Sequence, residues 1–233
     1  MESLEAELQR ARDLDVDDLA DAIETIGFEC TRCGACCKAV ECDERADERN
    51  DANREEHTAT VFPDEIRRLQ ATDDYDWRDV ARPMPYGLSD GPDGPEGETF
   101  EWALQTDDCG DCVFYQESNG TGACTVHDDR PLICRTYPFS VALGGTSQPM
   151  GEAVDEEGIV RAHECEGLGR EIDRADARSL AAALKERAIR ELEEAIAIRD
   201  GYRPAGVDGV VVHDSEGAKR PDGTLLDRRR DTE

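Results

Sequence analysis

Ten cysteines constrain the folding of this 233-residue chain more than any other feature. They stand at positions 30, 33, 36, 37, 42, 109, 112, 124, 134 and 165, so five of them fall within residues 30–42. The opening MESLEAELQR lacks the basic and apolar regions of a secretion signal, and no apolar stretch reaches the length of a membrane span. We therefore expect a cytoplasmic protein, in which cysteines serve as metal ligands or redox thiols before structural disulfides.

The charge balance limits the partners of such a chain. Asp and Glu number 56 against 27 Lys and Arg, which gives a formal net charge of -29. A surface of this kind repels phosphate groups, so we expect no binding to nucleic acid or to anionic membranes. The acids are spread along the chain among apolar positions, as expected for a protein of a high-salt cytosol, where screening weakens self-repulsion. A halophilic source is therefore our hypothesis.

Apolar spacing predicts three helical regions. Residues 4–26 show the three-and-four spacing of an amphipathic helix, with a break expected near 13–15. A short helix is expected at 63–71, with Pro63 in its first turn. Residues 171–199 have high helix propensity and one apolar stripe, and Asp200-Gly201 is expected to end that helix. The stripe consists of Leu180, Leu184, Ala188, Leu192 and Ile196.

Strands are expected to be few and short. Residues 99–104 alternate, with Phe100, Trp102 and Leu104 on one side, and further strands are expected at 124–126 and 139–143. Asp129 and Pro131 are expected to cap and start a helical turn that carries Cys134. Three polar stretches complete the chain: a loop or solvated helix at 41–60, a loop at 82–98 and a loosely held tail after 201.

These elements predict an α+β fold, a small domain organised by metal with an N-terminal helix and a long C-terminal helix. With only 38% hydrophobic and 5% aromatic residues, the core is lean, and a metal is expected to replace part of it. The expected parts are a helical segment at 1–27, a cysteine-cluster metal-binding domain at 28–170, a helix at 171–201 and a polar tail at 202–233. An acidic, Gly- and Pro-rich insertion occupies about 41–98 of that domain.

The cysteine spacing itself allows more than one metal. Cys30, Cys33 and Cys36 match the first three positions of the bacterial ferredoxin pattern, but Val40 stands where the fourth cysteine belongs. Adjacent Cys36 and Cys37 do not easily face one small cluster, so further thiolates are expected from the second group, 109–165. Alternatively, Cys30-x2-Cys33 and Cys109-x2-Cys112 pair as two knuckles around one zinc.

Four further motifs accompany the first cysteine run. Residues 28–37 read F-x-C-x2-C-G-x-C-C, followed by Cys112-Val113-Phe114 and then Cys124-Thr125-Val126-His127. Residues 130–138 read RPLICRTYP, and Cys165-Glu166-Gly167 comes last. In order and spacing this resembles the YkgJ-type cysteine-cluster family, described as a zinc- or iron-chelating domain. The chain departs from the family pattern at Val113, where proline is common, and in its long insertion.

The resemblance implies eight ligands and leaves out Cys42 and Cys109. The eight are Cys30, Cys33, Cys36, Cys37, Cys112, Cys124, Cys134 and Cys165. They suit an iron-sulfur cluster, with 4Fe–4S favoured, and zinc is the alternative. His127 or His163 could replace a thiolate. Arg130 and Arg135 could donate hydrogen bonds to cluster sulfurs or form salt bridges to surface carboxylates.

Three functions remain open at the level of the sequence. The first is an iron-sulfur protein in electron transfer or redox sensing, with an unidentified redox or protein partner. The second is a zinc-stabilised structural or interaction module. The third is an enzyme similar to the protein lysine N-methylases, in which a related cysteine pattern occurs. No phosphate-binding loop, nucleophile elbow or His-Glu-x-x-His helix is present.

Overall fold

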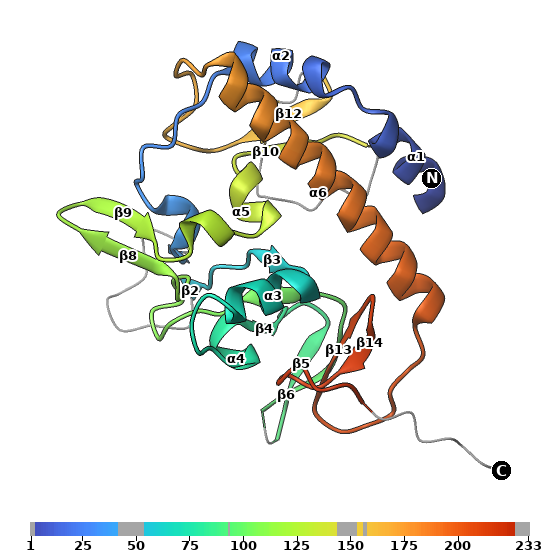
Figure 1. Ribbon diagram of the computed structural model, residues 1–233. Coiled ribbons are helices and arrows are strands. Elements are labelled where there is room, and N and C mark those ends of the chain that lie inside the picture. Colours follow the sequence, from blue (N-terminus) through green and yellow to red (C-terminus); the bar gives the residue numbers. More distant parts are fainter. Residues whose placement is uncertain (1–2, 42–53, 93, 144–152, 156–157, 227–233) are drawn as a thin grey trace. The chain divides into compact units, whose positions relative to one another are not determined.

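The computed structural model describes residues 3–41, 54–92, 94–143, 153–155 and 158–226 (Figure 1). The chain divides into two compact units. The first unit comprises Met1–His57 and Thr106–Ile196, and the second comprises Thr58–Gln105 and Ala197–Glu233. Helices and several small sheets together make the α+β fold that the sequence predicts. Within the described ranges, none of the helices has the length and apolar character needed to cross a membrane.

Two helices begin the first unit, as the expected break in 4–26 predicts. They are α1 (Leu4–Asp13) and α2 (Val16–Ile26). The Ser3 hydroxyl accepts the amide of Ala6, and the Asp15 carboxylate accepts the amides of Asp17 and Asp18. A capping side chain satisfies amides that lack a partner in the first turn, so Asp15 starts α2, whereas α1 ends at Asp13 with Leu14 as its C-cap.

The other helical elements of the first unit lie further along the chain. They are η1 (Ala35–Cys37), η3 (His127–Asp129), α5 (Leu132–Thr136) and α6 (Arg174–Gly201), which belongs to the first unit up to Ile196. The predicted turn that carries Cys134 is α5. Its N-cap is Pro131, however, without a side-chain cap, so the expected role of Asp129 is wrong.

Among the residues that the structure describes, three small antiparallel sheets belong to the first unit. β1 (Val40–Glu41) pairs with β2 (Arg54–Glu55), and β8 (Tyr115–Ser118) pairs with β9 (Thr121–Cys124). The third sheet has the order β10 (Phe139–Val141), β12 (Val160–His163), β11 (Ala153–Asp155). In its register Phe139 lies opposite Ala162, and Val141 lies opposite Val160.

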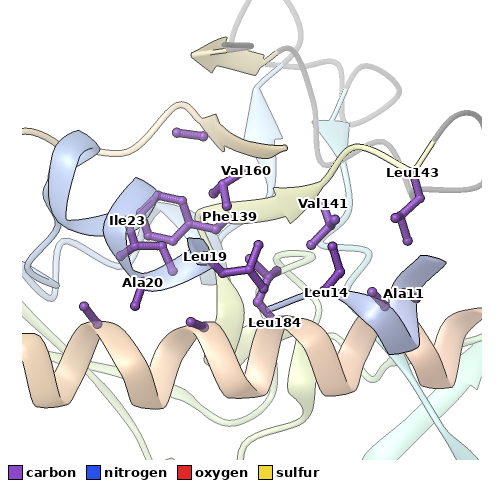
Figure 2. Packing of buried hydrophobic residues seen from close by; sticks show 14 of the residues in the cluster. Ala11, Leu14, Leu19, Ala20, Ile23, Phe139, Val141, Leu143, Val160 and Leu184 are labelled. Atoms are coloured by element: carbon purple, nitrogen blue, oxygen red, sulfur yellow. The ribbon is translucent and has the colours of Figure 1, made fainter. Parts of the chain in front are cut away.

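The core of the first unit forms where α1, α2 and α6 meet the sheet of β10 and β12. Figure 2 shows Leu19 and Ile23 of α2 beside Phe139, with Leu184 of α6 directed toward them. Leu184, Ala188 and Leu192 are buried, as the predicted stripe requires, and Leu180 and Ile196 are partly buried. Burying one such leucine contributes about 1.5–3 kcal/mol, so this face of α6 holds the unit together.

The described part of the second unit contains two sheets, two short helices and the end of α6. The sheet of order β3 (Thr60–Val61), β7 (Trp102–Leu104), β4 (Ala81–Pro83) is accompanied by α3 (Pro63–Gln70) and α4 (Trp77–Val80). The other sheet has the order β14 (Gly217–Lys219), β13 (Val210–Asp214), β6 (Gly94–Thr99), β5 (Leu88–Gly91). Within it β13 and β6 run parallel, and both other pairs are antiparallel.

Several local predictions from the sequence differ from the observed structure of the second unit. The expected loop at 82–98 contains the hairpin β5–β6, and the expected loose tail contains β13 and β14. Val211 and Val212 are buried there, so part of this segment belongs to a core. The polar residues that surround them in the sequence do not indicate this burial. Phe100 is 42% exposed whereas Trp102, Ala103 and Leu104 are all buried, so the expected alternation is wrong.

The helix expected at 63–71 is confirmed as α3, and the strand predictions that remain fall in the first unit. The strand expected at 124–126 lies instead at Thr121–Cys124, and the strand expected at 139–143 is shortened to Phe139–Val141. Much of the polar stretch 41–60, including Cys42, lies outside the described residues. The domain boundaries given from the sequence stay predictions.

Candidate metal centre

The eight cysteines assigned as ligands, here called the cysteine cluster, come from separate segments of the first unit. Cys30 and Cys33 lie between α2 and η1, Cys36 and Cys37 lie in η1, and Cys112 precedes β8. Cys124 ends β9, Cys134 lies in α5, and Cys165 follows β12. No local spacing rule alone brings these segments together.

Backbone hydrogen bonds join the first cysteine segment to the second group. The amide of Cys112 donates to the carbonyl of Cys37 at 2.8 Å, and the amide of Gly122 donates to that of Arg32 at 2.8 Å. Glu29 donates to the carbonyl of Gly167 at 3.0 Å. The structure therefore brings the segment 29–37 against the segments that carry Cys112, Cys124 and Cys165.

Gly167 permits the closest of these approaches. A Cβ atom at Gly167 would stand 2.3 Å from the carbonyl oxygen of Glu29, closer than any real contact. The amide of Gly167 also points its N–H at the sulfur of Cys165, at 3.4 Å. The glycine of the Cys-x-Gly motif thus allows the close approach of the Glu29 backbone, and its amide donates to the Cys165 sulfur.

Tyr115 covers the turn between Cys33 and Cys36. Gly34 has φ +79°, and a Cβ atom there would stand 2.2 Å from the Tyr115 hydroxyl oxygen. That hydroxyl donates to Glu117 at 2.8 Å, and Lys38 lies 2.5 Å from the same carboxylate oxygen. Lys38 also lies 5.2 Å from the centre of the Tyr115 ring. No sequence motif indicates these contacts, although Lys38 is one of only three lysines and could have drawn attention to them.

Helix α6 fixes the turn that carries Cys134. Arg187 is 3% exposed, and its Nη1 donates to the Thr136 hydroxyl at 3.1 Å and to the Phe139 carbonyl at 3.3 Å. Its Nε donates to Glu191 at 2.6 Å. The guanidinium therefore ties the end of α5 and the start of β10 to the long helix.

The thiols of the cysteine cluster share one electrostatic environment. Burial, followed by the charges of Cys124 and Cys36, raises the pKa of Cys112 to about 11. Burial and then the charges of Cys112, Cys36 and Cys124 raise the pKa of Cys134 well above its ordinary value. Each thiolate therefore disfavours ionisation of its neighbours, and only a nearby positive charge would stabilise several thiolates at once.

Cys36 is the member that interacts with most of the others. Its sulfur lies 3.8 Å from that of Cys37, and this contact, followed by lost hydration, raises the pKa of Cys36. Burial raises the pKa of Cys165, and the charges of Cys33, Cys36 and Cys30 add to the rise. All eight cysteines are thus linked by interactions between neighbouring thiols.

Arg130 is the arginine of the RPLICRTYP motif that acts on these thiols. It is half-buried, its Nε donates to the His127 carbonyl at 2.9 Å, and its charge opposes the rise in pKa of Cys36, Cys124 and Cys134. Arg135 is exposed. The structure therefore distinguishes two arginines that the sequence treats alike.

The two candidate histidines lie in different surroundings. His127 is exposed, with Nδ1 3.4 Å from an Asp128 carboxylate oxygen. His163 is 5% exposed, and its Nε2 lies 2.8 Å from the Ser140 hydroxyl. Metal ligation by either histidine stays a prediction, as do the ligand roles of the cysteines.

The thiols of the cysteine cluster interact electrostatically, but within the described part of the chain they do not form a metal coordination shell. Across the described ranges, no three His, Cys, Asp or Glu side chains form a group that could hold a metal ion. Cys109 is exposed, and its amide donates to the Asp107 carboxylate at 2.8 Å. Cys42 lies outside the described residues.

Comparison with known families agrees with the motifs. The family model CxxCxxCC, described as "Putative zinc- or iron-chelating domain", matches residues 29–166, which include all eight cysteines of the cluster. Comparison with the curated proteins and with the solved structures found no match. The family description supports metal binding and leaves the choice between zinc and iron open. The match covers more than half of the 233 residues, so the chain belongs to the CxxCxxCC family, as its motifs indicate.

Proposed function

We propose that the cysteine cluster binds an iron-sulfur cluster, with 4Fe–4S the favoured type, for electron transfer or redox sensing. The observation that supports the proposal is that thiols from separate segments interact: Cys36 contacts Cys37 and acts on Cys112, Cys124, Cys134 and Cys165, while Cys30 and Cys33 act on Cys165. Cysteine thiolates are the usual ligands of iron-sulfur clusters, and zinc accepts the same set. When bound, such a cluster supplies one-electron transfer.

The roles of the chain's own residues follow from their positions. The thiolates would hold the metal, and the N–H of Gly167 would donate to the sulfur of Cys165. The positive charge of Arg130 would offset part of the negative charge that thiolates bring. Both effects favour the reduced form of a cluster and so raise its reduction potential. Because the thiols must draw together, metal binding and final folding are expected to be coupled.

Purification without oxygen tests the proposal directly. We expect the purified protein to contain iron and inorganic sulfide, to absorb at about 400 nm and to give an EPR signal after reduction. Bound zinc without iron would overturn the iron-sulfur assignment and favour the alternative, a zinc-stabilised interaction module. Protein that holds neither metal would contradict both.

Two cysteine variants give a matched comparison. Cys134→Ala removes a proposed ligand and should lower the bound metal per chain. Cys109→Ala removes an exposed cysteine outside the cysteine cluster and should leave the metal content unchanged. Equal metal loss in both variants would contradict the assigned ligand set.

The remaining expectations on partners and location belong to the same proposal. We expect an unidentified redox or protein partner in the cytoplasm, and no binding to nucleic acid or anionic lipid, because the net charge of -29 disfavours the last two. Cell fractionation and filter binding with a DNA duplex would test these points.

A further inference from the structure

A groove of about 600 Å³ lies in the first unit beside the start of α6 and the beginning of the cysteine segment. Its walls come from two stretches of chain, residues 28–30 and residues 171–180. Hydrogen bonds from Glu29 to Gly167 and from Gly169 to Gly27 hold these stretches side by side. The groove is therefore built by the same contacts that position Cys30 and Cys165.

The lining combines an apolar floor with an acidic rim. Phe28, Ile172 and Leu180 are partly buried hydrophobic residues that pack against the core. Four carboxylates surround them, namely Glu29, Glu171, Asp173 and Asp176, and all four residues are exposed. Cys30 completes the wall and is also exposed.

The basic residues nearby leave this rim negative. Of the residues that the structure describes, no lysine, arginine or histidine lines the groove. Arg170, which is not among the lining residues, lies 4.0 Å from Glu29, and Arg174 contacts Asp21 of α2 at 2.5 Å and Glu24 at 2.7 Å. A ligand that enters the groove therefore meets four carboxylates, one of which, Glu29, has an arginine 4.0 Å away.

We propose that this groove docks a basic segment of a partner protein, one that places an apolar side chain on the floor and lysines or arginines at the rim. Complementary charges in direct contact set the orientation of the segment, and burial of the apolar side chain adds affinity. Because Cys30 forms part of the wall, a docked partner would stand beside the metal centre, and this placement rests on the proposed function. The partner is thus a protein with a cationic docking surface.

Peptide binding to the metal-loaded protein tests the groove. The probe is a labelled synthetic 12-residue peptide of alternating lysine and leucine, and two companions replace every lysine with glutamate or every leucine with serine. The lysine-leucine peptide should bind, the glutamate peptide should not, and the serine peptide should bind at least tenfold more weakly. Hydrogen exchange should slow at 28–31 and 171–176 on binding.

Two triple variants separate the groove from the general acidity of the surface. The first, Glu29→Gln with Glu171→Gln and Asp176→Asn, keeps Asp173, whose side chain accepts the amide of Asp176. The control, Asp74→Asn with Asp90→Asn and Asp208→Asn, removes the same charge at exposed positions of the second unit. The groove variant should weaken peptide binding at least tenfold, and the control less than twofold.

The outcomes separate this inference from the proposed function. Equal weakening in both variants, or hydrogen exchange protection elsewhere, would overturn the docking site whether or not metal is bound. Protein that binds the peptide at the groove but contains no metal would leave the docking site standing and overturn the proposed function.

Discussion

Gly34 lies under Tyr115 in the turn between Cys33 and Cys36, where two constraints act on one residue. The backbone has φ +79°, which costs a residue with a side chain about 1 kcal/mol, and the Tyr115 hydroxyl stands where a Cβ atom would be. Gly167 meets only the second constraint, against the Glu29 carbonyl. Both glycines thus control how closely the cysteine segments approach.

Substitution of Gly34 separates its two constraints. Gly34→Ala should lower the free energy of unfolding by about 2 kcal/mol or more, through backbone strain and the overlap with Tyr115. In a Tyr115→Ala background the same change should cost only the backbone part, about 1 kcal/mol. Urea unfolding of the four proteins measures the difference. An equal cost in both backgrounds would show that Tyr115 does not exclude the side chain.

Glu216 gives a residue-scale prediction of pH dependence in the second unit. Arg67, with hydrogen bonds of 3.1 and 2.5 Å, and then Lys219 at 2.7 Å lower the pKa of Glu216 to about 2. Since the unfolded carboxyl has a pKa of about 4.3, the ionised form favours the folded state above that pH. This contribution to stability is lost as the pH falls from about 4.3 to about 2.

The Glu216→Gln variant checks the sign. The wild type should be more stable than the variant near pH 6, and the difference should shrink as the pH falls toward 2. Thermal unfolding at a series of pH values measures it. In an Arg67→Met background the difference should be smaller at every pH, and a constant difference would contradict the role of this ion pair.

Helix α6 is the element on which the first unit depends most. Its apolar face packs on α1, α2 and the sheet of β10 and β12, and its Arg187 reaches the segment after Cys134. A buried polar group gains little from its hydrogen bonds, but its removal leaves partners unsatisfied at a cost of about 1–3 kcal/mol. The helix therefore positions a proposed ligand through one side chain.

Two arginines of α6 form a matched pair of variants. Arg187→Met should lower the free energy of unfolding by about 1–3 kcal/mol and also lower the metal content, because α5 loses its anchor. Arg178 lies on α6 as well, and it forms an exposed ion pair with Asp17 of α2. Arg178→Met removes this pair and should cost less than about 1 kcal/mol. Unfolding curves and metal analysis measure both. A similar loss from the two variants would contradict the anchoring role.

The whole molecule carries its charge on both compact units. Every segment contributes acids to the net charge of -29, and self-repulsion of this size opposes the compact state in dilute buffer. At molar salt the Debye length falls to about 3 Å, so most of the repulsion between exposed charges is screened. Stability should therefore depend on salt far more than in an ordinary protein.

A salt series tests the halophilic hypothesis. The midpoint of thermal unfolding should rise steadily between about 0.05 and 2 M KCl. The variant with Asp74, Asp90 and Asp208 changed to Asn should be more stable than the wild type in dilute buffer, and the difference should fade at high salt. Equal stability across the series would contradict the hypothesis.

The sequence predicted the helices well and the strands of the second unit poorly. Helices depend on local spacing and caps, as at Asp15 and along the α6 stripe. Strand β13 pairs with β6, more than a hundred residues earlier, and no local signal reports such pairing. Lys219 shows the difference most clearly. It lies in a polar segment expected to be a loose tail, yet it is 2% exposed and forms an ion pair with Asp214 at 2.7 Å.

Ten cysteines, their order and their non-cysteine neighbours determined the family and the eight candidate ligands, because ligand type and spacing are properties of the chain itself. Only the tertiary structure decided that Cys37 meets Cys112 and that Gly167 meets Glu29. It also decided that Tyr115 covers Gly34 and that an acidic groove opens beside Cys30. These contacts join residues far apart in the sequence, so they depend on the path of the folded chain and leave no local pattern.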